Sequence, residues 1–194
     1  MNLGDMKDWV VRTVKRPEKR DDQIQDAINA AIEYAITRGD FVNDLAEVDV
    51  AISSSVYSQS IVISTSFTRF RKIKYLRPST YKRYLSWRDP SRIFNQDGCE
   101  ATDVWYRAGD NIVFNLSVLQ STMKVGYYQY PAFLTEDTDT QWTMDQMPSC
   151  IHDLACWRVF EQIGNESESS RFFNIASKYL AAHKDDKQDG VSHS

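Results

Sequence analysis

The first part of the chain alternates between apolar and polar positions with the period of an α-helix. Four apolar residues near the start fall on one predicted helix face: Leu3, Met6, Val10 and Val14. This spacing predicts a short helix over residues 3–14. Asp21 or Asp22 can cap a second helix, because an aspartate side chain accepts a hydrogen bond from an unpaired backbone N–H group. Gly39 is placed to end that helix with a positive φ angle.

The second predicted helix has a strongly apolar face. Its isoleucines step by four residues and stand beside small alanines: Ile24, Ile28, Ile32 and Ile36, with Ala27, Ala31 and Ala35. Small residues beside large ones let another element approach closely. Such a face suits two arrangements: it can line a ring and pack on a neighbouring subunit, or it can pack against the chain's own sheet.

The period shortens towards two in the middle of the chain, which indicates strands. Apolar and polar residues alternate in short runs: Val48, Val50 and Ile52, then Ile61 and Ile63, then Met123, Val125 and Tyr127. Residues 108–111 have the sequence Ala-Gly-Asp-Asn between two apolar runs, which lets the chain reverse in a hairpin. Pro131 ends the last strand, because proline cannot donate to a sheet ladder. A long exposed loop is expected over residues 89–99.

Helical signals return after an acidic loop at residues 135–140. Pro148 and Ser149 are typical of a helix start, and residues 165–168 can cap a final helix. The apolar stripe of that helix has five members: Phe172, Ile175, Ala176, Tyr179 and Leu180. In the tail beyond it, Val191 is the one large apolar anchor, so we expect the tail to order only on a partner.

Together these patterns predict an α+β protein. N-terminal helices in residues 1–46 precede an antiparallel sheet of about five or six strands in residues 47–131. C-terminal helices in residues 132–183 form a helical layer with the N-terminal ones, and residues 184–194 form a flexible tail. We expect these segments to make one structural unit.

Composition excludes several classes of protein. The chain of 194 residues has no apolar run that approaches the roughly 18 residues of a membrane span, and we see no signal peptide. Its three cysteines are too few for a disulfide framework, which indicates a reducing compartment. We therefore expect a soluble protein made inside a cell, with no membrane partner.

Candidate catalytic chemistry is scarce. The fingerprints of nucleotide-binding proteins and hydrolases are missing from the sequence, so we expect no enzyme. The one Cys/His cluster is Cys150, His152 and Cys156, in which Cys150 points away from the other two on a helix. The acidic loop at residues 135–140 lacks the turn glycine and final glutamate of a calcium loop. We expect no catalytic, cofactor or metal site.

One segment is strongly basic. Residues 69–92 hold nine basic residues and one acid, a formal charge of +8 in a chain whose total is −4. The basic residues are Arg69, Arg71, Lys72, Lys74, Arg77, Lys82, Arg83, Arg88 and Arg92. Aromatic residues alternate with them, as on a nucleic-acid platform where cations meet phosphate and rings stack on bases. A solvated sheet face has the same composition, and so does a surface that meets an acidic protein.

Two groups of residues are candidate partner-binding sites. The first comes from the basic segment and the second from the tail: Arg69, Arg71, Lys74, Arg83 and Arg88, and Lys184, Asp185, Asp186 and Val191. An acidic chain is a poor general DNA binder, because DNA phosphates repel it. A protein partner or plain solvation is therefore preferred for the basic group.

Several motifs follow one another in a characteristic order. They are R-G-D-F at 38–41, F-T-R-F-R-K-I-K-Y-L at 67–76, an aromatic Gly-Asp-Asn hairpin at 104–115, Y-Y-Q-Y-P at 127–131, L-T-E-D-T-D-T at 134–140 and a helix after Pro148. In this order and spacing, the chain resembles the head-to-tail adaptor, or connector, proteins of tailed bacteriophages. The similarity extends over most of its length.

The resemblance implies a structural virion protein at the head-tail junction, made in the host cytoplasm. Such adaptors form a homo-oligomeric ring of about twelve copies below the portal protein. They seal or extend the DNA channel and dock tail nozzle, hub or fibre proteins. Their helices form the channel layer, their tails reach into the portal ring, and genomic DNA passes during ejection without sequence-specific binding.

Two alternatives stay open at this point. The chain can be a tail-terminator or tail-tube ring protein, or it can be a phage DNA-binding accessory protein. Ring contacts between identical copies need two different complementary patches on each copy. The basic segment and the acidic remainder of the chain can supply such a pair.

Overall fold

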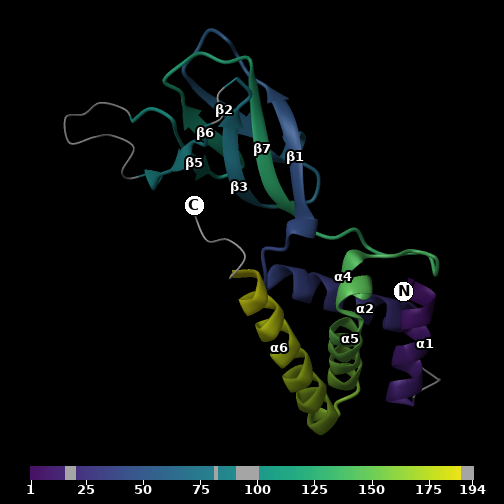
Figure 1. Cartoon of the computed structure of the whole chain (residues 1–194). Helices are drawn as coiled ribbons and strands as arrows, with labels where there is room; N and C mark the ends of the chain where they lie inside the picture. Colours follow the sequence, from purple (N-terminus) through teal and green to yellow (C-terminus); the bar gives the residue numbers. More distant parts are fainter. Residues whose placement is uncertain (16–20, 81–82, 91–100, 189–194) are drawn as a thin grey trace. The chain divides into compact units, whose positions relative to one another are not determined.

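The computed structural model of the chain describes residues 1–15, 21–80, 83–90 and 101–188. The chain forms two compact units, Met1–Asn43 with Pro131–Ser194, and Asp44–Tyr130. The first, the helical unit, is built from helices, and the second, the sheet unit, is built mainly from strands (Figure 1). The predicted α+β class, with a strand region between N-terminal and C-terminal helices, is confirmed. That all segments act as one structural unit stays a prediction.

The described part of the helical unit contains five helices. They are α1 (Leu3–Val14), α2 (Asp21–Thr37), α4 (Trp142–Gln146), α5 (Pro148–Gln162) and α6 (Glu166–Gln188). The bounds of α1 are those predicted, and Pro148 is the first residue of α5, where its missing N–H group costs no hydrogen bond. Asn165 accepts a hydrogen bond from the N–H of Glu168 at 3.3 Å, which caps α6 as expected. Across the described residues, no helix is long and apolar enough to cross a membrane.

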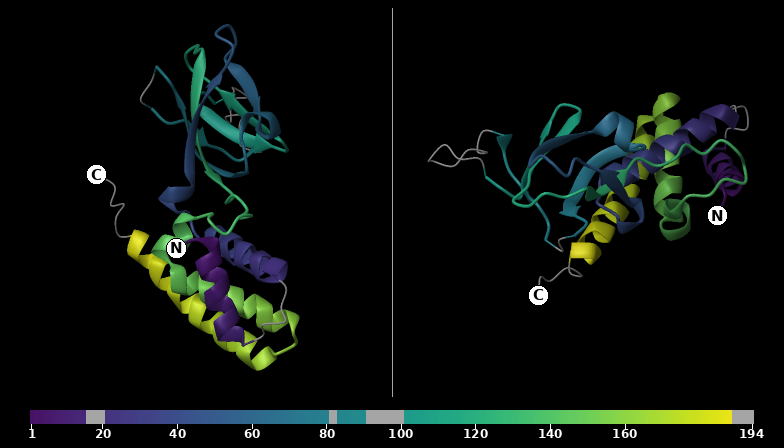
Figure 2. Two further views of the ribbon diagram at one scale, coloured as in Figure 1. Left: turned by 90° about the vertical axis from the view of Figure 1, so that its right-hand side faces the viewer. Right: turned by 90° about the horizontal axis from the view of Figure 1, so that it is seen from above.

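One hydrophobic core joins these helices, which pack against one another within their unit (Figure 2). The four isoleucines of α2 are fully buried in it: Ile24, Ile28, Ile32 and Ile36. Helix α2 packs on α5 and α1, and α5 packs on α6. Both predicted arrangements for the isoleucine face are therefore wrong, because other helices of the same unit already cover it.

Gly39 follows α2 for a different reason from the predicted one. The described glycines with positive φ are Gly109 and Gly164, and Gly39 is not among them. A Cβ atom on Gly39 would lie 2.7 Å from two atoms of the Phe41 ring. Glycine is needed here because the ring lies against the backbone, not because the backbone is left-handed.

The acidic loop is bonded to the start of α1. The N–H of Leu3 donates to the carbonyl of Asp139 at 2.9 Å, and the N–H of Gly4 donates to the carbonyl of Asp137 at 3.0 Å. The first N–H groups of a helix have no partners within it, so these bonds complete the N-terminus of α1.

The described part of the sheet unit contains two sheets in place of the single predicted one. Their strand orders are β1-β7-β3 and β2-β6-β5-β4. The strands are β1 (Leu45–Ala51), β2 (Ser58–Val62), β3 (Phe70–Pro78), β4 (Ser86–Trp87), β5 (Val104–Ala108), β6 (Asn111–Asn115) and β7 (Thr122–Gln129), and a 3₁₀ turn (Val42–Asp44) precedes β1. Neighbouring strands are antiparallel except β4 and β5, which are parallel. Residues from both sheets share one core.

The local sequence signals for the hairpin and for strand β7 are confirmed in the sheet unit, and one strand prediction is wrong. β5 and β6 form the predicted hairpin, and Gly109 in its turn has a φ of 60°. Met123 and Val125 of β7 are buried in the shared core, as their alternation predicts. Ile63 was predicted in a strand, but it begins the short helix α3 (Ile63–Ser66), where its N–H donates to the carbonyl of Asp110 at 2.8 Å. The alternation of apolar residues here spans a strand end and a helical turn.

The predicted exposed loop and the predicted flexible tail are described only in part. Most of the loop at residues 89–99 lies outside the described residues. Helix α6 continues to Gln188, so the backbone of residues 184–188 is helical, whereas the sequence predicted a flexible tail from residue 184. Extending an existing helix by a few residues is easy, because the costly step is the first turn.

Candidate interaction surface

The three-stranded sheet turns one face to the shared core and carries charged and aromatic side chains on the other. Side chains alternate along each strand, and the strand register places the second set side by side. We call this set the outer face: Glu47 and Asp49 on β1, Lys124, Gly126 and Tyr128 on β7, and Lys72, Tyr75 and Arg77 on β3. Strand β7 lies between the other two, so β1 and β3 occupy opposite sides of the face (Figure 1).

A buried tyrosine carries a basic cluster on this face. Tyr128 is 3% exposed, and three cations lie over its ring: Arg71, Lys72 and Lys74, at 5.2, 5.6 and 5.9 Å from the centroid. A cation is attracted to the electron-rich face of an aromatic ring. Two register shifts between β3 and β7 insert Arg71 and Lys74 as extra residues, and such bulges redirect side chains. The bulges therefore gather three charges over one ring.

The middle of the outer face is filled by a second tyrosine. A Cβ atom on Gly126 would lie 2.4 Å from Cε1 of Tyr75, so the Tyr75 ring rests directly on the backbone of β7. Tyr84 meets Tyr75 edge to face, with ring centroids 5.1 Å apart, and is 55% exposed. The N–H of Leu85 donates to the carbonyl of Leu76 at 2.9 Å, which holds the short segment around Tyr84 beside β3.

Acidic side chains occupy the β1 side of the outer face. Nζ of Lys124 lies 3.1 Å from Oδ1 of Asp49 and 3.8 Å from Oε2 of Glu47. Both carboxylates stay exposed. The face is therefore acidic along β1 and basic along β3. Sequence reasoning missed this acidic side, although two acids spaced by two residues in a strand point to the same face.

The predicted partner-binding residues of the basic segment fall into separate places. Arg71 and Lys74 lie together over the ring of Tyr128, which belongs to the outer face. Arg69 stands in the turn before β3 with a φ of 47°. Arg83 lies beside β3, at a cavity of ≈ 140 Å³, and Arg88 follows β4 of the other sheet. The basic segment is therefore not one continuous platform.

The predicted tail sites lie at the limit of the described residues. The backbone of Lys184, Asp185 and Asp186 belongs to α6. Val191 lies outside the described residues. A docking role for this tail stays a prediction.

His152 is packed within the helical unit. Its Nδ1 lies 2.9 Å from Oδ1 of Asp153, and its Nε2 lies 2.8 Å from Oγ1 of Thr13. Its ring stacks on Trp9 with centroids 4.1 Å apart. Both ring nitrogens have protein partners, and the side chain is buried. These contacts join α5 to α1.

The two cysteines of α5 are poor nucleophiles at neutral pH. Burial, followed by the charge of Asp153, raises the pKa of Cys150 to about 12 and also raises the pKa of Cys156. Protonated thiols neither attack substrates nor bind metals well. Among the residues that the structure describes, no group of three His, Cys, Asp or Glu side chains is placed to hold a metal ion. The arrangement serves packing in the helical unit.

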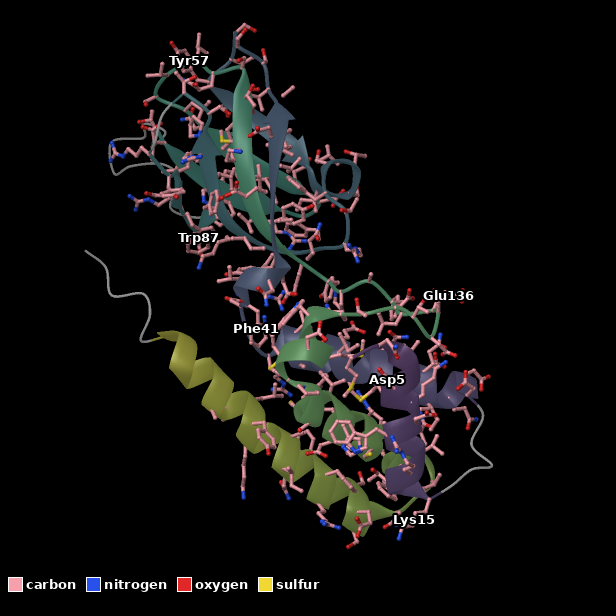
Figure 3. The ribbon with its side chains drawn as sticks, turned by 45° about the vertical axis from the view of Figure 1, so that its right-hand side comes forward. Asp5, Lys15, Phe41, Tyr57, Trp87 and Glu136 are labelled. Carbon is pink, nitrogen blue, oxygen red and sulfur yellow. The ribbon has the colours of Figure 1, made fainter. Side chains whose placement is uncertain are left out.

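Sequence reasoning also missed a buried lysine in α1. The side chain of Lys7 is 8% exposed, and its Nζ lies 2.7 Å from Oδ2 of Asp21 and 2.8 Å from Oδ1 of Asp137. Burial alone would lower the pKa of Lys7, but the hydrogen bonds and charges of the two aspartates raise it above its ordinary value. Asp5 and Glu136 lie at the same end of the helical unit (Figure 3). The signal in the sequence that could have revealed this site is the position of Lys7 on the apolar stripe of α1.

Comparison with known proteins identifies the family of this chain. No curated protein matches the chain. The family model described as SU10 adaptor protein matches residues 1–192, which is nearly the whole chain. This match agrees with the resemblance to phage head-to-tail adaptors that the motifs carry. The chain belongs to the SU10 adaptor protein family.

Proposed function

We propose that this chain forms a ring of about twelve copies at the head-tail junction of a phage. There it binds below the portal protein, seals or extends the DNA channel, and docks tail components. The observation that carries this proposal is the family match over residues 1–192, because a phage adaptor is a structural protein of the virion.

The proposed role depends on contact surfaces and not on catalytic groups. An adaptor needs surfaces for its own copies and for the proteins above and below it. The helical unit has a continuous core that makes it a firm building block, and the sheet unit offers an outer face with separated charges. Genomic DNA passes through the ring, and no base-specific contact is needed for that passage.

One alternative has a specific observation in its favour. The three cations around Tyr128 have the composition of a nucleic-acid platform. Tyr128 is buried, however, so its ring is not available to stack on a base. Glu47 and Asp49 on β1 lie two strands away from the cations of β3, on the same face of the sheet, and they repel phosphate. A DNA-binding accessory protein is therefore the second candidate function.

We expect the purified chain to sediment with phage heads that contain portal protein. Heads without portal are the control, and they should leave the chain in the supernatant. In parallel, a gel shift with a short DNA duplex should show little binding at physiological salt. A DNA-binding protein would instead show an affinity that falls by roughly one power of the salt concentration for each phosphate contact. Strong, salt-sensitive DNA binding without sedimentation would favour the accessory protein. Capture by tail tubes in place of heads would favour a tail-terminator.

We also propose that the tail at residues 184–194 docks on the portal. Truncation after Gln188 keeps the described length of α6 and removes Val191. The melting temperature of the free chain should not change, while affinity for portal-containing heads should fall at least about tenfold if Val191 is buried in the complex. A chain whose last six residues are replaced by glycine and serine is the length-matched control and should behave like the truncation. Full attachment of both chains would contradict the docking role.

A further inference from the structure

We propose that the outer face of the three-stranded sheet joins adjacent copies of this chain. The β3 side of one copy lies against the β1 side of the next copy, and this contact repeats around the ring. The inference rests on the ring assembly proposed above and names the surface that holds it together.

The position of the strands provides the first argument. β1 and β3 are the two outer strands of their sheet, and β7 lies between them. Their outer sides therefore point in opposite directions within the sheet. A ring of identical copies uses heterologous contacts, in which two different patches of each copy meet. Patches on opposite sides of one sheet satisfy this requirement, because each copy then meets one neighbour on each side.

The distribution of charge provides the second argument. The β1 side carries the exposed carboxylates of Glu47 and Asp49. The β3 side carries Lys74 and Arg77, and Arg83 lies beside the same strand. Surfaces of opposite charge steer partners together and fix their register. Two copies placed side by side in the same orientation bring the acidic side of one to the basic side of the other.

The form of β3 indicates that side chains, and not backbone hydrogen bonds, make this contact. β3 has two register shifts, and lysine and arginine occupy its length. Bulges and charged residues are the features that prevent an outer strand from adding another strand. Tyr84, exposed beside β3, supplies apolar area of the kind found in protein interfaces.

The same charges explain why the occupant is a second copy and not DNA. A phosphate backbone laid across the sheet would meet Glu47 and Asp49 as well as the cations. A neighbouring copy meets only the side that complements it. Exposed ion pairs are weak one at a time and are screened by salt. The contact therefore suits assembly on a template, where many weak contacts act together.

Two variants test the contact by making both sides of the sheet alike. The acid-edge variant carries Lys74→Glu, Arg77→Gln and Arg83→Glu. The base-edge variant carries Glu47→Lys and Asp49→Lys, with Lys124→Glu to keep opposite charges across β1 and β7. A control variant carries Arg12→Glu and Lys178→Glu, which change charge at exposed positions outside the three-stranded sheet. Circular dichroism and thermal melting establish that all variants fold.

The number of copies bound per portal-containing head should be at least tenfold lower for each edge variant alone than for the unaltered chain. The reason is that like charges meet at every contact between copies. An equal mixture of the two variants should restore binding, since acid-edge and base-edge chains can alternate around a ring with an even number of copies. The control variant should bind like the unaltered chain. The same chains are also compared without heads by sedimentation velocity at low salt, where the unaltered chain and the mixture should associate and the single variants should not.

The outcomes separate this inference from the proposed function. Association of the unaltered chain and of the mixture at low salt, without binding to heads, would leave the contact standing and overturn the portal role. Normal assembly of either edge variant alone, or failure of the mixture, would overturn the contact. Normal assembly of the acid-edge variant together with lost DNA binding would assign the β3 side to nucleic acid. Absence of association in the unaltered chain, both free and on heads, would overturn both.

Discussion

Replacing Gly126 with valine should destabilise the sheet unit by about 3 kcal/mol. The new Cβ atom would lie 2.4 Å from Cε1 of Tyr75, and two more atoms of that ring would be within 2.9 Å. Gly126 is in β7, which pairs with both other strands, so the backbone cannot move without disturbing two strand pairs. The Tyr75 ring must leave instead, and it then loses its edge contact with Tyr84.

Urea unfolding with hydrogen exchange read by mass spectrometry measures this effect. Exchange should rise in β1, β3 and β7 and stay unchanged in α1 and α5, because the substitution touches the sheet unit alone. Thr122→Val is the matched control, since it changes another residue on the same strand and face, and it should shift stability by less than about 0.5 kcal/mol. A valine variant that unfolds at the same urea concentration as the unaltered chain would show that the Tyr75 ring does not rest on β7.

Replacing Asn29 with alanine should destabilise the helical unit by about 2–3 kcal/mol. Asn29 is buried in α2, and its amide makes two hydrogen bonds to the backbone of Leu134: Nδ2 donates to the carbonyl at 3.0 Å and Oδ1 accepts from the N–H at 2.9 Å. Leu134 is itself buried, so alanine leaves its N–H without a partner and away from water. An unsatisfied buried donor retains its full desolvation penalty.

Gln25 provides the matched control for this prediction. Its Nε2 also donates to the carbonyl of Leu134, at 3.1 Å, but that carbonyl keeps Asn29 when Gln25 is lost. Gln25→Ala should therefore lower stability by less than about 1 kcal/mol. Thermal melting, followed by the circular dichroism signal of the helices, compares the stability of the two variants. Equal losses would mean that the Leu134 N–H finds water in the Asn29 variant.

The helices were predictable because their signals are local. The stripe that ends at Val14 fixes α1, and Pro148 fixes the start of α5. What covers a helix face is not a local property, and both arrangements predicted for the isoleucines of α2 failed for that reason. Lys7 shows the same limit, since its partners Asp21 and Asp137 are separated from it by 14 and 130 residues. A pattern within one helix cannot reveal such partners.

The sheet unit exposes a second limit of sequence reasoning. Alternation predicted β7 and the turn at Gly109, but it carries no information on which strands pair. β2 pairs with β6, more than forty residues away, and this pairing creates the second sheet. The basic segment divides between the two sheets for the same reason. Arg71 and Lys74 meet only because two bulges in β3 turn them towards Tyr128, and bulges depend on the partner strand.

The most direct test of the account is a cryo-electron microscopy reconstruction of portal-containing heads incubated with this chain. We predict a closed ring of about twelve copies directly below the portal. In that ring the sheet units stand side by side, with β3 of each copy next to β1 of its neighbour. Density for the chain inside a tail tube, along DNA, or as isolated copies on the head would contradict the account.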